Sequence, residues 1–128
     1  MRKIVVSIRN GLLSEAIIRT LNNCDDFLPY QLCPGENTGV FEQCKSIGAD
    51  ILLMEVSYAP GTTIEARLDE ARQIHSKCPE CKVVMLCDDK SAPEIAYKVT
   101  QLKKDRLIDS FFFTSVTENY LVSALASL

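Results

Sequence analysis

Ala49-Asp50-Ile51-Leu52-Leu53-Met54-Glu55-Val56-Ser57 is a short apolar run with polar residues near both ends. The four residues 51–54 are all apolar, so this segment has no polar face to turn toward water. A strand that is hydrophobic on both faces is typical of the centre of a parallel sheet that helices cover on both sides. The stretch therefore predicts a central strand over residues 51–56.

Similar short runs alternate with helical segments along the rest of the chain. We expect strands over residues 4–8, 30–33, 51–56, 82–87 and 108–113. After each of them, apolar residues recur at the three- and four-residue spacing of an amphipathic helix. Five strands alternating with five helices predict a single α/β domain over residues 1–128, with a parallel sheet between two helical layers.

Turn and capping residues place several element boundaries. The pair Pro34-Gly35 indicates a turn after the second strand. Expected helix caps are Gly48 at a C-terminal end, Thr62 with Glu65, Ser91 with Glu94, and Thr117.

Composition and charge restrict the classes of function. The chain has 128 residues and a formal net charge of −3 from 14 basic and 17 acidic residues. This balance gives no electrostatic footprint for nucleic acid or an anionic membrane. The apolar run after Met1 ends at Arg9, too early for a signal peptide or a membrane span, so we expect a cytoplasmic protein. In that reducing compartment the cysteines should remain thiols. They are Cys24, Cys33, Cys44, Cys78, Cys81 and Cys87.

The residues that end the strands are the ones to consider for function. In an open parallel sheet, ligands bind beyond the carboxyl ends of the strands, where the strand order reverses. Those ends are Ile8-Arg9-Asn10, Glu55, Cys87-Asp88-Asp89 and Thr114-Ser115.

Three segments of the chain resemble the receiver domain of bacterial response regulators, the proteins of two-component phosphorelay signalling. Residues 49–57 with Pro60-Gly61 are similar to that family's third strand and its loop. Residues 107–115 are similar to its fifth strand, and Leu12-Leu13-Ser14-Glu15-Ala16 to the start of its first helix. The resemblance implies a flavodoxin-like sheet with the strand order 2-1-3-4-5.

At the phosphorylation site the sequence departs from that family. The two acidic residues that hold Mg²⁺ in the family correspond to Ile8 and Arg9, and the phosphate-accepting aspartate corresponds to Glu55. The resemblance also assigns the switch positions: the family's hydroxyl residue corresponds to Cys87 and its lysine to Thr114. Of the family's switch residues, only the aromatic one is retained in this sequence, as Phe111.

These departures predict that phosphoryl transfer fails. Phosphoryl transfer needs a divalent cation and positioned positive charge, and Mg²⁺ prefers carboxylate and water ligands. Ile8 offers no ligand, Arg9 would repel the ion, and no metal or cofactor is expected. We hypothesise instead that Arg9 pairs directly with Glu55, whose fixed charge imitates a phosphorylated state. In the alternative interpretation, Glu55 accepts hydrogen bonds from nearby backbone groups or faces water.

Two other functions remain open from the sequence. A receiver of this kind could be phosphorylated by altered chemistry. Less favoured is a metal or redox role for the CxxC segment Cys78-Pro79-Glu80-Cys81, with His75 nearby. Because that segment follows a helix and precedes a strand, we expect a turn with one or both cysteines packed against the core.

The segment Phe111-Phe112-Phe113 bears on partners. Alternation along a strand sends Phe112 to the opposite side from its two neighbours, and we expect Phe112 in the core. The resemblance implies a possible homodimer through the fourth helix, fifth strand and fifth helix. We therefore expect a degenerate receiver that acts on protein partners and is not an enzyme. DNA would be reached only through an output domain that this sequence does not include, and no membrane contact is expected.

Overall fold

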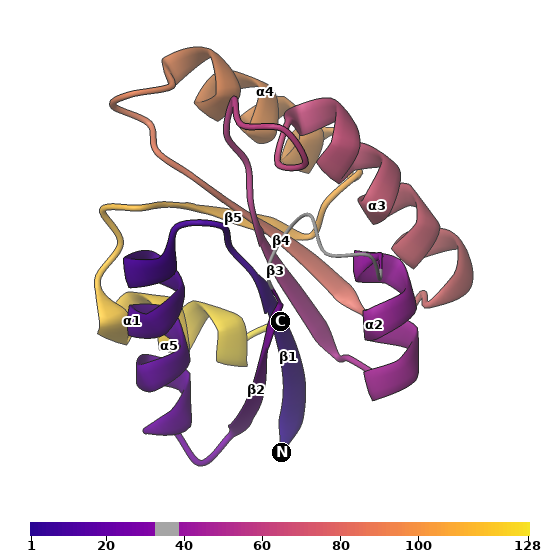
Figure 1. Cartoon of the computed structure of the whole chain (residues 1–128), viewed down its shortest axis with the longest axis vertical. Coiled ribbons are helices and arrows are strands. Elements are labelled where there is room, and N and C mark those ends of the chain that lie inside the picture. The colour runs from indigo at the N-terminus through magenta and orange to yellow at the C-terminus, as the bar shows by residue number, and fades with distance from the viewer. Residues whose placement is uncertain (33–38) are drawn as a thin grey trace.

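The computed structural model of the chain describes residues 1–32 and 39–128. Five strands alternate with five helices along the sequence (Figure 1). The strands are β1 Arg2–Ser7, β2 Phe27–Leu32, β3 Ile51–Glu55, β4 Lys82–Cys87 and β5 Ser110–Phe113. The helices are α1 Gly11–Asn22, α2 Val40–Ile47, α3 Ile64–Lys77, α4 Pro93–Lys104 and α5 Glu118–Ala126.

All strands lie in one parallel sheet with the order β2-β1-β3-β4-β5. The predicted flavodoxin-like fold is therefore confirmed. In the register, Ser7 lies opposite Met54, Glu55 opposite Leu86, and Cys87 opposite Phe113. The last residues of β1, β3, β4 and β5 consequently meet at the same edge of the sheet.

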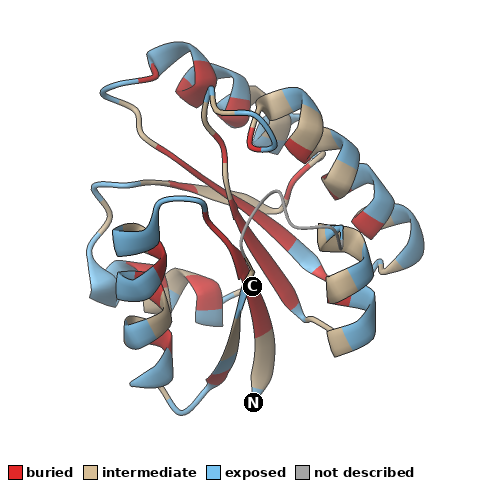
Figure 2. Ribbon diagram, viewed as in Figure 1, coloured by how far each residue is buried: buried red, intermediate tan, exposed pale blue. Residues whose placement is uncertain are grey.

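Two hydrophobic clusters hold the helices onto the sheet. Helices α1 and α5 cover one face, and α2, α3 and α4 cover the other (Figure 1). The central segment Ile51–Met54 is fully buried, and its residues alternate between the two clusters. Figure 2 shows this burial as a continuous red band along the middle of the sheet. The all-apolar run that predicted a central strand thus supplies both cores at once.

The first strand is also tied to the last helix. The Arg2 guanidinium donates to the backbone oxygens of Leu125 at 3.0 Å, Ala126 at 2.6 Å and Leu128 at 3.0 Å. It also lies over the Phe27 ring, 5.8 Å from the centroid. A cation at a helix C-terminus satisfies carbonyl groups that have no partner within the helix.

Several predicted boundaries need correction. Strand β1 ends at Ser7 and not at Ile8, β2 begins earlier at Phe27, and β5 is shorter, beginning at Ser110. The predicted end of the second strand at Cys33 and the turn Pro34-Gly35 lie outside the described residues.

Some of the predicted helix caps are confirmed and others are wrong. Gly48 ends α2 with φ +73°, and Thr117 accepts a hydrogen bond from the Tyr120 N–H, so both predictions are confirmed. Helix α3 is capped by Thr63, which accepts from the Ala66 N–H, and not by Thr62.

The predicted cap of α4 is also wrong. This helix begins at Pro93 after Ala92, which offers no capping side chain, and the Ser91 hydroxyl donates to Asp88. Proline at the first turn suits the position, because its missing N–H would have no partner there.

Within the described residues, none of the helices combines the length and the hydrophobicity that crossing a bilayer requires.

Candidate functional site

A pocket of about 350 Å³ opens at the carboxyl edge of the sheet. Its lining includes three of the predicted site residues, namely Glu55, Cys87 and Thr114. The other lining residues are Asn10, Leu13, Val56, Ser57, Tyr58, Leu86, Asp88, Ser91 and Ala92. The position of the pocket agrees with the rule that open parallel sheets bind ligands beyond their carboxyl ends.

Ile8 and Arg9 do not line this pocket. Ile8 is 2% exposed and packs in the cluster under α1 and α5. Arg9 is exposed at the start of the loop to α1. Neither side chain can therefore act as a cation ligand in the pocket.

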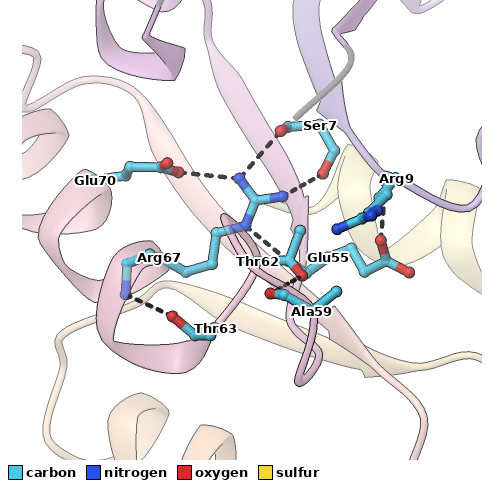
Figure 3. A network of polar contacts seen from close by, with 9 residues as sticks. Ser7, Arg9, Glu55, Ala59, Thr62, Thr63, Arg67 and Glu70 are labelled. Carbon is cyan, nitrogen blue, oxygen red and sulfur yellow. Dashed lines mark hydrogen bonds and ion pairs between the residues drawn. The ribbon is translucent and has the colours of Figure 1, made fainter. Parts of the chain in front are cut away.

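The predicted ion pair between Arg9 and Glu55 is wrong. The Glu55 carboxylate accepts a hydrogen bond from the backbone N–H of Arg9, with 2.9 Å between N and Oε1 (Figure 3). The Arg9 guanidinium instead donates to the carbonyl oxygen of Pro60 at 3.3 Å. The alternative interpretation, in which Glu55 bonds to the nearby backbone, is the one observed. Neighbouring strand ends predicted the proximity, but the side-chain rotamer of Arg9 depends on the loop after β3.

A different arginine joins the strand ends, and sequence reasoning missed it. Arg67 of α3 is 0% exposed and reaches beneath the sheet edge (Figure 3). Its Nε donates to Glu55 O at 2.7 Å, and its Nη2 donates to Ser7 O at 2.9 Å. Its Nη1 contacts Ser7 Oγ at 3.1 Å and forms an ion pair with Glu70 Oε2 at 3.0 Å. One guanidinium thus binds the final carbonyls of β1 and β3.

The sequence did contain a signal for Arg67. In α3 the residues that pack toward the sheet are Ile64, Ala71 and Ile74, and Arg67 falls on the same stripe. A charged residue on the buried face of a helix is rarely found without a polar partner. The helical periodicity could therefore have marked Arg67 as a residue with buried partners.

The loop between β3 and α3 is held by its own hydrogen bonds. The Ser57 N–H donates to Thr62 O at 2.8 Å, and the Thr62 hydroxyl donates to Ala59 O at 3.0 Å. Ser57 Oγ lies 2.6 Å from Thr62 Oγ1. Gly61 takes φ +85°, a left-handed conformation that favours glycine, and this lets the loop turn back. Thr62 is fully buried in this arrangement, which explains why the cap role passes to Thr63.

The loop between β4 and α4 closes the other side of the pocket. The Asp88 carboxylate accepts hydrogen bonds from the Ser91 hydroxyl at 2.9 Å and from the Lys90 N–H at 3.0 Å. The bond from Ser91 is the main cause that lowers the pKa of Asp88. The Tyr58 hydroxyl donates to Glu94 Oε2 at 2.8 Å, which joins the loop after β3 to the first turn of α4. This bond also raises the pKa of Tyr58.

The switch positions are placed by β4 and β5. Cys87 is 1% exposed, and burial raises the pKa of its thiol to about 11. Thr114 is exposed, and its N–H donates to Cys87 O at 3.0 Å. Phe111 is partly buried, and its ring centroid is 5.6 Å from that of Phe113. Phe112 is 6% exposed, which confirms its predicted place in the core.

We tested whether the residues present suit the Mg²⁺ ion that the resemblance implies. Two carboxylates line the pocket. Glu55 accepts a hydrogen bond from the Arg9 N–H, and Asp88 accepts one from the Lys90 N–H in its own loop. The buried Arg67 guanidinium donates to the backbone oxygen of Glu55 and so places a positive charge next to this residue. Over residues 1–32 and 39–128 no group of three or more histidine, cysteine or acidic side chains could hold a metal ion. The residues therefore do not fit a hard divalent cation.

The CxxC segment lies at the opposite edge of the sheet, in the turn from α3 to β4. The Cys81 N–H donates to Cys78 O at 2.9 Å, which closes the turn. Cys81 is buried and Cys78 packs against the same cluster, so the predicted turn with core-packed cysteines is confirmed.

Solved structures of response-regulator receiver domains share this fold. The signal receiver domain of NarL from Mycobacterium tuberculosis is 18% identical with a TM-score of 0.75, over 98% of this chain and 94% of that one. RcsB from Salmonella typhimurium is 16% identical with a TM-score of 0.75, over 99% of this chain and 61% of that one. TrrA from Thermotoga maritima, solved with Mg²⁺ and a beryllium fluoride, is 13% identical with a TM-score of 0.67, over 99% and 98%. No protein-family model and no curated protein matches the sequence.

Proposed function

We propose that this chain is a receiver-type signalling module that acts through protein contacts and is not phosphorylated at Glu55. The observation that carries the proposal is the state of the Glu55 carboxylate. It accepts the Arg9 backbone N–H, and the carbonyl group of the same residue binds the buried Arg67 guanidinium. The acceptor position is thus already engaged by groups of the chain itself.

The charges around the pocket support this proposal. Phosphoryl transfer to a carboxylate requires a divalent cation to neutralise the phosphoryl oxygens. The positive charges near Glu55 are those of Arg9 and Arg67, which are fixed parts of the chain and not a bound metal ion. Ile8 is buried in the core, away from the pocket. Phosphoryl transfer also needs a positive charge to stabilise the negative charge that develops on the phosphoryl group, and Thr114 offers only a hydroxyl at that position.

The same contacts support a single, fixed signalling state. Glu55 keeps a negative charge at the end of β3 without any modification, and the hydrogen bond from Arg9 holds that charge toward the loop after β1. The Tyr58–Glu94 bond joins the loop after β3 to the first turn of α4. We propose that partners recognise this one arrangement.

A homodimer through α4, β5 and α5 is part of the proposal. Strand β5 is at the edge of the sheet, and an edge strand is where association occurs. Tyr97 on α4 is 67% exposed, and Phe111 and Phe113 of β5 are partly buried. RcsB, one of the similar structures, is described as dimers bound to DNA. This chain spans 59% of that RcsB chain, so DNA binding is not proposed for it.

Intact mass spectrometry after incubation with acetyl phosphate and Mg²⁺ tests the main proposal. We expect the wild-type mass to stay unchanged. The matched comparison is the double variant Arg9→Asp with Glu55→Asp, which removes the guanidinium and shortens the acceptor while Ile8 stays in the core. Isothermal titration should detect Mg²⁺ binding by this variant and not by the wild type.

Two results would contradict the proposal. A phosphoryl group on the wild-type chain that hydroxylamine removes, and that maps to Glu55, would establish the alternative of phosphorylation by altered chemistry. Mg²⁺ binding by the wild type with the same affinity as the double variant would contradict the inference that Arg9 and Glu55 exclude the ion.

A further inference from the structure

A second cavity, of about 410 Å³, lies at the amino-terminal edge of the sheet and is lined by three cysteines. Cys44 comes from α2, and Cys78 and Cys81 come from the turn before β4. Cys44 and Cys81 are each 2% exposed, and Cys78 is partly exposed. This cavity is at the opposite end of the strands from the pocket around Glu55, so the inference does not rest on the proposed function.

The topology explains why these cysteines meet. The N–H groups of Gly48 and Ala49 donate to Cys44 O at 2.9 and 3.0 Å, so the last turn of α2 leads directly into β3. The Lys82 N–H donates to the carbonyl oxygen of Asp50 at 2.9 Å, just before the pairing of β3 with β4 begins. Cys44 and Cys81 therefore flank the starts of two adjacent parallel strands.

The two buried sulfurs interact. The Cys44 thiol donates a hydrogen bond to the sulfur of Cys81, and this bond lowers the pKa of Cys81 although burial and the carboxylates of Asp50 and Asp109 act against it. The same bond, followed by burial, raises the pKa of Cys44. A thiolate is the form of cysteine that attacks an oxidant. Cys81 is accordingly the first of the pair to react.

We propose that Cys44 and Cys81 form a dithiol site that a small hydroperoxide oxidises to a disulfide. The site is built from the cavity that both cysteines line, which admits a small oxidant, and from the two strand starts that hold both cysteines in place. The product would join α2 covalently to the start of β4.

The chemistry balances in two steps. The Cys81 thiolate attacks one oxygen of the hydroperoxide, the O–O bond breaks, and the leaving oxygen takes a proton to give water or an alcohol. Cys44 sulfur then attacks the sulfur of the Cys81 sulfenic acid, the S–O bond breaks, and the hydroxide takes the Cys44 proton to leave as water. Two thiols lose two electrons, and one peroxide gains them.

Cys78 is the competing partner for Cys81. The hydrogen bond from Cys81 N–H to Cys78 O at 2.9 Å closes a turn in which the two Cα atoms are near enough for a disulfide. We assign Cys44 because it lines the same cavity, is buried to the same extent as Cys81 and packs in the same hydrophobic cluster. The hydrogen bond with Cys44 that lowers the pKa of Cys81 supports this choice.

Peptide mapping of the wild-type chain after limiting hydrogen peroxide distinguishes these partners. A glutamate-specific protease cleaves after Glu80 and separates Cys78 from Cys81, which a trypsin digest leaves on one peptide. Non-reducing mass spectrometry should find Cys44 linked to Cys81, two hydrogens lighter than the sum of the two peptides. Alkylation before oxidation should modify Cys78 more than either buried thiol.

Variants give the second measurement. Cys78→Ser should still form the disulfide, and Cys44→Ser should leave Cys81 as a trappable sulfenic acid. Cys24→Ser, on the far side of the sheet, is the matched control and should form the disulfide at the wild-type rate. A disulfide between Cys78 and Cys81, or oxidation of Cys24 ahead of both Cys44 and Cys81, would overturn the proposal.

Discussion

Arg67 is the residue on which the carboxyl edge of the sheet depends most. A guanidinium carries five N–H donors in a planar fork, and here three of its nitrogens serve Ser7, Glu55 and Glu70. Lysine could not reproduce this arrangement, because its ammonium is a single point charge on a flexible stem. The final carbonyls of β1 and β3 lie where sheet pairing ends, so this side chain supplies donors that the sheet does not.

Replacing Arg67 by methionine should destabilise the fold. The substitution keeps much of the buried volume but leaves the oxygens of Ser7 and Glu55 without these donors and Glu70 without its partner. We expect the free energy of unfolding to fall by about 3 kcal/mol, in the range found when one partner of a buried pair is removed. Urea denaturation followed by circular dichroism measures this loss.

Arg72→Met is the matched control on the same helix. Arg72 is 63% exposed at its side chain, and its Nη1 lies 3.9 Å from Asp69 Oδ1. Exposed ion pairs of this kind contribute little to stability, so the expected change is within about 0.5 kcal/mol. Equal losses for the two variants would mean that the Arg67 contacts are not what holds the edge.

Cys87 should make stability depend on alkaline pH. A thiol is uncharged when protonated, and burial raises the pKa of Cys87 from 9.0 to about 11. Between these values the unfolded chain releases the proton while the folded chain keeps it, so stability is lost as the pH rises through this interval. For this residue the loss is on the order of 2 kcal/mol.

The measurement compares urea denaturation of the wild type and Cys87→Ala from pH 7 to pH 11. At neutral pH the variant should be less stable, because it leaves a small cavity in the hydrophobic cluster under α2, α3 and α4, to which Cys87 belongs. Above pH 9 the difference between the two chains should shrink. Parallel curves over the whole interval would show that Cys87 does not titrate as its burial implies.

For individual residues, the sequence predicted where a side chain lies in the fold better than it predicted which group that side chain contacts. Glu55, Cys87 and Thr114 line one pocket because parallel strands end at one edge, which hydrophobic patterning is enough to establish. The partner of Glu55 was predicted wrongly, since the Arg9 side chain follows the Pro60 carbonyl of a loop whose path no periodicity encodes. The periodicity of α3 could have marked Arg67 as buried, but only the three-dimensional structure shows that Ser7 is its partner.

Helix ends illustrate the same limit at the level of elements. Thr62 and Thr63 are adjacent and chemically alike, so the sequence alone gave no means to choose the cap of α3. The choice is made by the preceding loop, in which Thr62 bonds Ser57 and Ala59. Where no loop competes for the side chain, as at Thr117, the capping pattern was sufficient.

Thr117→Ala should weaken α5. The Thr117 hydroxyl oxygen accepts the Tyr120 N–H at 3.2 Å, and loss of such an N-cap costs about 1 kcal/mol. Ser123→Ala on the exposed part of the same helix is the control, since alanine has the higher helix propensity and no cap is removed. Thermal unfolding should rank the control at or above the wild type and Thr117→Ala below both. The reverse ranking would exclude a capping role.

For the whole molecule, the fold followed from patterning because each level of the sequence agreed with it. Apolar runs of strand length alternate with amphipathic helices, and the middle run is apolar on both faces, so the layered parallel sheet was predicted correctly. The strand order came from the resemblance to receiver domains, and it is the order observed. Edge elements were less well predicted, since β2 and β5 are half covered and their patterns are weaker.

The proposed dimer belongs to this scale as well. If α4, β5 and α5 associate, Tyr97→Glu should place a charge in the contact and raise the dissociation constant at least about tenfold, the factor that corresponds to 1.4 kcal/mol. Leu12→Glu on α1, where the side chain is also highly exposed, should leave association unchanged. Sedimentation velocity over a range of concentrations measures both. A wild-type chain that stays monomeric, or equal effects of the two variants, would remove the dimer from the proposal.

An arginine that belongs to the chain cannot be diluted, exchanged or chelated. The junction of β1 and β3, which Arg67 binds, is therefore completed when the protein folds and does not wait for a dissolved ion. Its shape should be the same in ion-poor and ion-rich surroundings, and a strong chelator should leave the melting temperature untouched. Under the proposed function, a module built in this way would present one constant surface to its partners.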